Sequence, residues 1–112
     1  MPFINIKTNA QISREAETNI KSALGRAITA VPGKSEGWLM VGLEQQTLYF
    51  RGTDEPAAIA QVSLYGNAGH AALDDLAGSI TDVVSQQLGI SPDRIYVSCF
   101  ATPDWGWNGS LF

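Results

Sequence analysis

The sequence predicts an α+β fold: two β-α-β units that share a four-stranded mixed sheet, with two helices on one of its faces. The length of 112 residues is that of one domain, which we place at residues 1–112. Hydrophobic residues make up 45% of the chain and charged residues 16%, which favours a packed chain over a disordered one. Two amphipathic segments each lie between strand-like segments, and packing both helices on one sheet face is the compact solution.

The first half of the chain contains a strand, a helix and two further short strands. Residues 3–8 are apolar and β-branched and predict the first strand. Ser13 offers a helix N-cap, two glutamates follow it, and apolar residues then recur at helical spacing until Pro32-Gly33 ends the pattern. Residues 38–43 and 47–50 predict the next two strands, separated by a turn.

The second half repeats this layout. Residues 58–65 predict a strand, and residues 73–88 predict an amphipathic helix that ends at a glycine. Gly78 lies inside that helix, which favours close packing against the sheet there. Residues 94–100 predict another strand, and the tail, residues 105–112, contains an Asn-Gly turn signal.

The expected second strand indicates that both faces of the sheet are buried. Trp38, Leu39, Met40 and Val41 are all apolar, so apolar side chains fall on both faces. Two helices can cover only one face of a four-stranded sheet. We therefore expect other subunits to cover the second face, which agrees with the low charge fraction.

Composition excludes several classes of function. A net charge of -4 and the absence of a basic run argue against nucleic-acid binding, and no apolar run approaches the ~20 residues of a membrane span. Cys99 is the only cysteine and His70 the only histidine, so neither an internal disulfide nor a zinc site of ordinary spacing is expected. No metal or cofactor is predicted. The N-terminal segment lacks the features of a secretory signal, so a cytoplasmic location is expected, with export without a signal peptide left open.

Pro2 is the most informative residue for chemistry. If Met1 is removed, Pro2 presents a secondary amine, which acts as a base only when it is neutral. Model α-amino groups titrate near pH 8, and apolar surroundings lower that value. Such surroundings could come from Phe3, Tyr65, Trp107 and Phe112. The alternative interpretation is that a proline merely begins a strand.

Other polar and aromatic candidates each have a structural alternative. Lys34 could hold a substrate carboxylate or interact with the last carbonyls of the first helix. Tyr96 and Ser98 share one face of their strand, where a tyrosine is usually a packing residue. Arg51 is a second cation that could meet an anion. Asp93 and Arg94 are interpreted as structural, and His70 as a loop or helix-start residue without a role. Trp105, Trp107 and Phe112 indicate a pocket rim, a subunit contact or a tail folded on its own core.

Four segments of the chain are informative together: Pro2 behind Met1, Pro-Gly-Lys at 32–34, Ser-Pro-Asp-Arg-Ile-Tyr at 91–96 and Trp-Gly-Trp-Asn-Gly-Ser-Leu-Phe at 105–112. With these segments the chain resembles the macrophage migration inhibitory factor (MIF) and D-dopachrome tautomerase family of the tautomerase superfamily. The resemblance implies a homotrimer whose three sheets enclose a channel, with a tautomerase pocket at each subunit interface. It implies a cofactor-free keto–enol tautomerase acting on small α-keto carboxylates, such as phenylpyruvate, or on dopachrome-type compounds.

The resemblance also implies roles for single residues. Pro2 matches the catalytic base, Lys34 the partner of the substrate carboxylate, Tyr65 a backbone N–H donor, and Tyr96 a pocket tyrosine from the neighbouring subunit. The substrate-binding residues are expected to be Lys34, Trp38, Tyr65, Tyr96, Ser98, Trp107 and Phe112.

Four positions depart from the family pattern. Ser98 stands where mammalian members have asparagine, and Trp105 is larger than its counterpart. Ala57 and Ala60 replace a Cys-x-x-Cys pair, so thiol-oxidoreductase activity should be absent.

Two other functions stay open on this sequence. One is a MIF-like cytokine or interaction protein that binds a receptor and has a vestigial pocket. The other is a cationic Pro2 acting as general acid in hydration, dehalogenation or decarboxylation, which only Arg51 favours.

Overall fold

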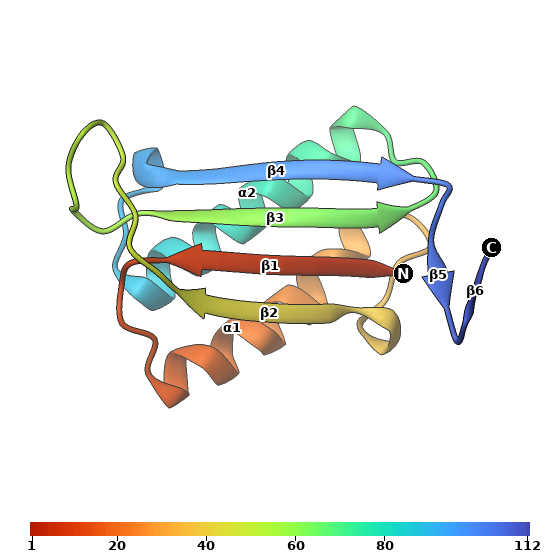
Figure 1. Cartoon of the computed structure of the whole chain (residues 1–112), viewed down its shortest axis with the longest axis horizontal. Helices are drawn as coiled ribbons and strands as arrows, with labels where there is room; N and C mark the ends of the chain where they lie inside the picture. Colours follow the sequence, from red (N-terminus) through yellow and green to blue (C-terminus); the bar gives the residue numbers. More distant parts are fainter.

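A four-stranded mixed sheet carries both helices on one face (Figure 1). The computed structural model describes residues 1–112. Its sheet contains β1 (Pro2–Thr8), β2 (Met40–Gln45), β3 (Ala58–Tyr65) and β4 (Ile95–Thr102), in the order β2-β1-β3-β4. β1 is parallel to β2 and antiparallel to β3, and β3 is parallel to β4. Helices α1 (Arg14–Ala27) and α2 (His70–Leu88) connect the two parallel pairs, so the predicted double β-α-β fold is confirmed.

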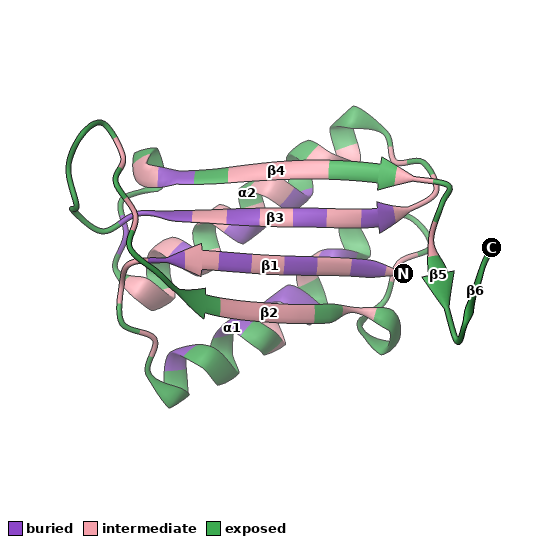
Figure 2. Ribbon diagram, in the orientation of Figure 1, coloured by how far each residue is buried: buried purple, intermediate pink, exposed green.

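The hydrophobic core lies between the sheet and the two helices. Along β1 and β3, buried residues alternate with partly exposed ones, as a strand with one covered face requires (Figure 2). Ile4 and Ile6 of β1 meet Ile20 and Leu24 of α1 and Ile80 of α2 in one cluster of buried side chains. Neither helix is long and apolar enough to cross a membrane.

No element of this chain covers the opposite face of the sheet (Figure 2). Met40, Tyr96 and Phe100 on that face are 66%, 61% and 64% exposed. These large side chains belong to the two outer strands, and the two middle strands contribute polar residues such as Asn5 and Gln61 to the same face. The sequence expectation that this face needs a cover therefore corresponds to an open surface in the single chain.

The predicted helix and turn signals have their expected geometry. The Ser13 hydroxyl accepts a hydrogen bond from the Ala16 N–H at 3.0 Å and caps α1. Gly89 ends α2 with a φ of +67°, a conformation that favours glycine. In the tail, β5 (Gly106–Trp107) and β6 (Ser110–Leu111) form a hairpin around Asn108 and Gly109, whose φ values are +53° and +93°.

Two predicted strands differ from the structure. Residues 47–50 lie in a loop, where Phe50 makes one isolated bridge to Thr53. Arg51 and Gly52 between them have φ values of +53° and +75°, which closes a tight turn instead of extending a strand. The second strand also starts later than predicted, because Glu36–Trp38 form a 3₁₀ turn before β2.

Gly78 does not pack against the sheet, contrary to expectation. It is exposed on α2, and an added Cβ would meet no heavy atom within 4 Å. Leu76 and Ile80 occupy the sheet-facing side of this helix instead. His70 is the first residue of α2, as predicted.

Candidate active site

Pro2 begins β1, a central strand of the sheet, at the end where β2 starts and β3 ends. Its side chain is buried, and its register partner on β3 is Leu64. A proline at the first position of a strand loses no ladder hydrogen bond that the strand needs. Met1 precedes it and is half-buried, and the Met1 carbonyl accepts a hydrogen bond from the Tyr65 N–H at 3.1 Å.

Lys34 reaches the same end of the sheet from the loop after α1. Gly33, with a φ of +81°, turns the chain there. The Lys34 Nζ donates to the Tyr65 carbonyl at 2.7 Å and lies 5.7 Å from the centroid of the Tyr65 ring. The alternative of a bond to the last carbonyls of α1 is not what the structure shows. Lys34 instead joins this loop to the end of β3, beside the N-terminus.

Burial and a neighbouring cation both act on the amino group at this site. Burial lowers the pKa of the Met1 amine from its ordinary value, and the charge of Lys34 lowers that pKa further. Desolvation and a nearby ammonium group each disfavour the protonated amine. The environment at this end of β1 therefore favours a neutral amine.

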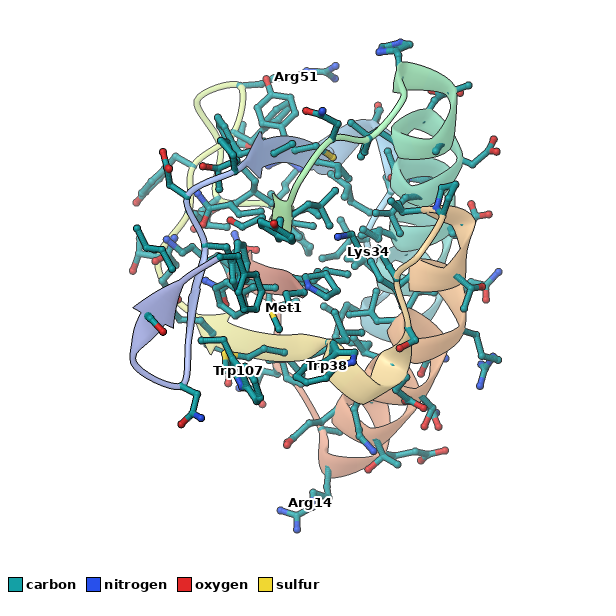
Figure 3. The ribbon with its side chains drawn as sticks, turned by 90° about the vertical axis from the view of Figure 1, so that its right-hand side faces the viewer. Met1, Arg14, Lys34, Trp38, Arg51 and Trp107 are labelled. Atoms are coloured by element: carbon teal, nitrogen blue, oxygen red, sulfur yellow. The ribbon has the colours of Figure 1, made fainter.

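Aromatic side chains form the wall of the cavity next to Pro2 (Figure 3). Trp38 and Trp107 meet edge to face, with ring centroids 5.2 Å apart. The cavity has a volume of about 550 Å³, and Pro2, Met40 and Trp105 also line it. Most of its lining is hydrophobic. Figure 3 shows Met1 between Lys34 and the pair of tryptophans.

The tail hairpin supplies three of the aromatic residues from one of its faces. The Phe112 N–H donates to the Trp105 carbonyl at 3.0 Å, which extends the hairpin pairing by one step. Side chains alternate along a strand, so Trp105, Trp107 and Phe112 project to the same side. The Phe112 ring lies 5.0 Å from that of Tyr65. Trp105 and Trp107 line the cavity beside Pro2, whereas Phe112 lies against Tyr65 outside that lining.

Tyr96 and Ser98 lie far from Pro2 in the same chain. They pair with Ile59 and Gln61 of β3, whereas the β4 residue opposite Leu64 is Ala101. Tyr96 is five residues from Ala101 along β4, which is roughly 17 Å at the rise of a β-strand. One chain therefore gathers Pro2, Lys34, Trp38, Tyr65, Trp107 and Phe112, and does not bring Tyr96 and Ser98 to them.

The other basic candidates are engaged elsewhere. The Arg51 Nη1 lies 3.6 Å from the Asp93 carboxylate, and both side chains are exposed. Arg94 donates to the carbonyls of Phe50, Thr53, Glu55 and Pro56, which fixes the loop between β2 and β3. The structural interpretation of Asp93 and Arg94 agrees with these contacts. Arg51 lies in that loop, outside the cavity beside Pro2.

Sequence reasoning missed two contributors. Asn9 donates to the carbonyls of Leu48, Asp54 and Glu55 and accepts from the Ala57 N–H, so it holds the same loop as Arg94. An asparagine at the end of a strand gave no signal of partners about 40 residues away. Met40 lines the cavity, and its register with Phe3 would have indicated this once β1 and β2 were paired.

Comparisons with known proteins agree with this geometry over the full chain. Residues 1–112 match the family model described as macrophage migration inhibitory factor. The macrophage migration inhibitory factor of Mus musculus is 29% identical over 115 residues, covering 100% of this chain and 99% of that protein. The homolog from Trichuris trichiura is 27% identical and is covered completely.

Solved structures of the same fold superpose closely. The crystal structure of Leishmania major MIF2 has a TM-score of 0.93 and 26% identity, with 100% of this chain and 97% of that chain covered. The MIF homologue from Prochlorococcus marinus has a TM-score of 0.88 and 27% identity, with 98% of each chain covered. The protein belongs to the macrophage migration inhibitory factor family, as the resemblance of its four short segments predicted.

Proposed function

We propose that this protein is a cofactor-free keto–enol tautomerase whose general base is the amine of Pro2, exposed when Met1 is removed. The observation that carries the proposal is the position of Pro2: a buried residue beside an apolar cavity, with the ammonium group of Lys34 close to the amine of the preceding Met1. Membership of the family supports tautomerase chemistry. The identity of the base and of the substrate rests on the site itself.

The surroundings of Pro2 suit a base that works near neutral pH. Burial and Lys34 lower the pKa of the Met1 amine. The Pro2 nitrogen lies one residue deeper in the same environment, so the same two causes should lower the pKa of its amine after Met1 is lost. A base whose pKa is close to the working pH is both available and strong enough to take a proton.

The vacated Met1 position indicates how a substrate would bind. Met1 currently uses the Tyr65 N–H as a hydrogen-bond donor to its carbonyl oxygen, at 3.1 Å. Loss of Met1 leaves that donor, with the Lys34 ammonium beside it, for the oxygens of an α-keto carboxylate. The indole rings of Trp38 and Trp107 would then pack against an apolar or aryl group.

The reaction moves one proton and shifts one double bond, and it leaves the heavy-atom skeleton of the substrate intact. The Pro2 amine removes a proton from the carbon next to the ketone, and the C–H electrons form the C=C bond of an enolate. The protonated amine then gives its proton to the oxygen, which yields the enol, and the reverse sequence regenerates the ketone. General-base catalysis of this kind contributes about 10²–10⁴-fold.

We further propose that the active form is a homotrimer in which Tyr96 and Ser98 complete the pocket of a neighbouring subunit. Two observations support this: the uncovered sheet face with its exposed Met40, Tyr96 and Phe100, and the ~17 Å between Tyr96 and the level of Pro2 along the strands. A second chain can cover the open sheet face and bring its own Tyr96 and Ser98 to the pocket.

Ultraviolet absorbance of phenylpyruvate tests the proposed reaction. Protein that begins at Pro2 should interconvert its keto and enol forms, and Pro2→Gly should remove at least about 90% of that activity. 2-Oxo-3-pentynoate, the inactivator in the structure of Pt0534, offers an independent probe. A neutral Pro2 amine should add to its alkyne, so tandem mass spectrometry should find the adduct on Pro2. An active Pro2→Gly protein, or an adduct on Lys34 alone, would contradict the assignment.

A receptor-binding role remains the alternative, because the relatives that match over the full chain bear the name of a migration inhibitory factor. The two roles separate experimentally, since Pro2→Gly replaces the proposed secondary-amine base by a primary amine without the proline ring and leaves the exposed surfaces of the protein unchanged. The third function, acid chemistry with Arg51, has no support within one chain, where Arg51 faces Asp93.

A further inference from the structure

We infer that Met1 is accessible to a methionine aminopeptidase only before the sheet closes, and that the folded chain no longer exposes the Met1–Pro2 bond to it. The inference concerns this bond as a site of proteolytic modification. It builds on the proposed function in one respect, because a chain that folds with Met1 would lack the proposed base.

The folded structure holds both sides of the bond. On the far side, Pro2 is buried and pairs with Leu64 of β3 at the end of the two central strands. On the near side, the Met1 carbonyl accepts from the Tyr65 N–H at 3.1 Å, and Met1 itself is half-buried against the cavity. Fraying of Met1 alone would not expose the Met1–Pro2 bond, because Pro2 would also have to leave the sheet.

Hydrolysis of the Met1–Pro2 bond requires access to groups that make other contacts in the folded chain. Water adds to the Met1 carbonyl carbon, the bond to the Pro2 nitrogen breaks, and that nitrogen takes a proton, which gives free methionine and the Pro2 amine. An aminopeptidase must bind the Met1 amino group, polarise the Met1 carbonyl oxygen and fit the following residue into its cleft. In the folded chain, that oxygen bonds to Tyr65, the amino group lies beside Lys34, and Pro2 is buried.

The order of synthesis leaves a time window for removal. Both residues that enclose the Met1–Pro2 bond, Leu64 and Tyr65, are made more than 60 residues after it. At about 5–20 residues per second, roughly 3–13 s pass before they are synthesised. During that time β1 has no β3 to pair with, and the N-terminus stays available to the peptidase.

Reconstituted cell-free translation can separate the two stages. The translation system would contain peptide deformylase and no aminopeptidase of its own. Purified methionine aminopeptidase would be added either during synthesis or after synthesis and folding. The control chain carries Gly-Ser inserted between Met1 and Pro2, which places its methionine outside the sheet. Intact mass spectrometry would report the loss of methionine over time.

We expect the natural chain to lose Met1 when the peptidase is present during synthesis, and to keep it at least about a hundredfold longer when the peptidase comes after folding. The control chain should lose its methionine in both arms. Loss from the folded natural chain at the rate of the control would overturn the inference, and so would retention of Met1 in both arms. This readout is a mass and not a rate of tautomerisation, so the inference can fail or hold independently of the proposed enzyme activity.

Discussion

Replacing Lys34 by alanine should slow turnover of phenylpyruvate about ten- to a hundredfold and change turnover of its methyl ester much less. The ammonium is the one cation at the proposed site, bonded to the Tyr65 carbonyl at 2.7 Å. A hydrogen bond to a charged group contributes roughly 1.5–3 kcal/mol, which sets the expected loss in kcat/KM for the acid. The ester carries no carboxylate, so it does not use this contact.

The same substitution also has a structural effect that must be separated. Lys34→Ala removes the bond between the loop after α1 and the end of β3. Lys34 is half-buried, so we expect a loss in the free energy of unfolding of about 1 kcal/mol. Lys34→Gln is the matched control, because a neutral amide can still donate to the Tyr65 carbonyl. This variant should keep more of the stability and still lose the preference for the acid.

Steady-state kinetics on both substrates, with melting temperatures for both variants, distinguish a role of Lys34 in substrate binding from a purely structural role. Equal losses on acid and ester, together with a lower melting temperature, would show that Lys34 is only structural. Full activity of Lys34→Gln on the acid would also refute the role of the charge. Salt gives a further check: about 0.5 M salt shortens the Debye length to a few ångströms, so kcat/KM of the acid should fall while that of the ester stays constant.

Four further predictions address the base, the assembly, the loop and the thiol. The kcat/KM of the processed enzyme should rise with pH through the pKa of the Pro2 amine, because the neutral amine is the active form; Lys34→Gln should move that rise to higher pH, and an unmoved profile would contradict the effect of the cation. Sedimentation at micromolar concentration should give about three times 12.0 kDa, and Tyr96→Ala should lower activity without unfolding the chain; an active monomer would refute the shared pocket. Arg94→Ala should lower the free energy of unfolding by about 2–4 kcal/mol, measured by urea denaturation, and Arg94→Lys should not restore it, because one ammonium cannot bond to four carbonyls. Burial raises the pKa of the Cys99 thiol, so alkylation should be slow at neutral pH and insulin-type thiol exchange undetectable; robust exchange that disappears in Cys99→Ser would contradict this.

Local sequence signals predicted the elements whose hydrogen bonds are local. Ser13, Gly89 and the Asn108-Gly109 pair each act on the backbone within a few residues, and each has the predicted geometry. The segment 47–50 contains residues of high β-propensity, yet it lies in a loop. Its surroundings are set by side chains distant in sequence, and no local pattern reports such contacts.

The residues of the candidate site also differ in how far the sequence predicts their positions. Pro2 and Lys34 lie at the same end of the sheet because β1 begins there and the loop after α1 returns to it, a consequence of the β-α-β connection that periodicity predicts. The aromatic wall was harder to predict, because it depends on how the tail hairpin folds back onto Trp38. Within one chain Tyr96 lies far from Pro2, and only the family resemblance assigned it to the pocket of a neighbouring subunit.

The single chain has an uncovered sheet face and a candidate site that its own Tyr96 does not reach. The proposed trimer explains both through one contact between subunits. Tyr96 is 61% exposed and packs only one edge, against the Phe50 ring at 5.0 Å. It lies on the same uncovered face as Met40, which lines the cavity beside Pro2 at the opposite corner of the sheet. A face that carries a pocket wall on one outer strand and a largely exposed tyrosine on the other is suited to a cyclic assembly, in which the β4 side of one copy meets the β2 side of the next. In such a ring every pocket receives its tyrosine from a neighbour. Burial of the open face and completion of the active site would then be the same event, so stability and activity should depend on assembly together.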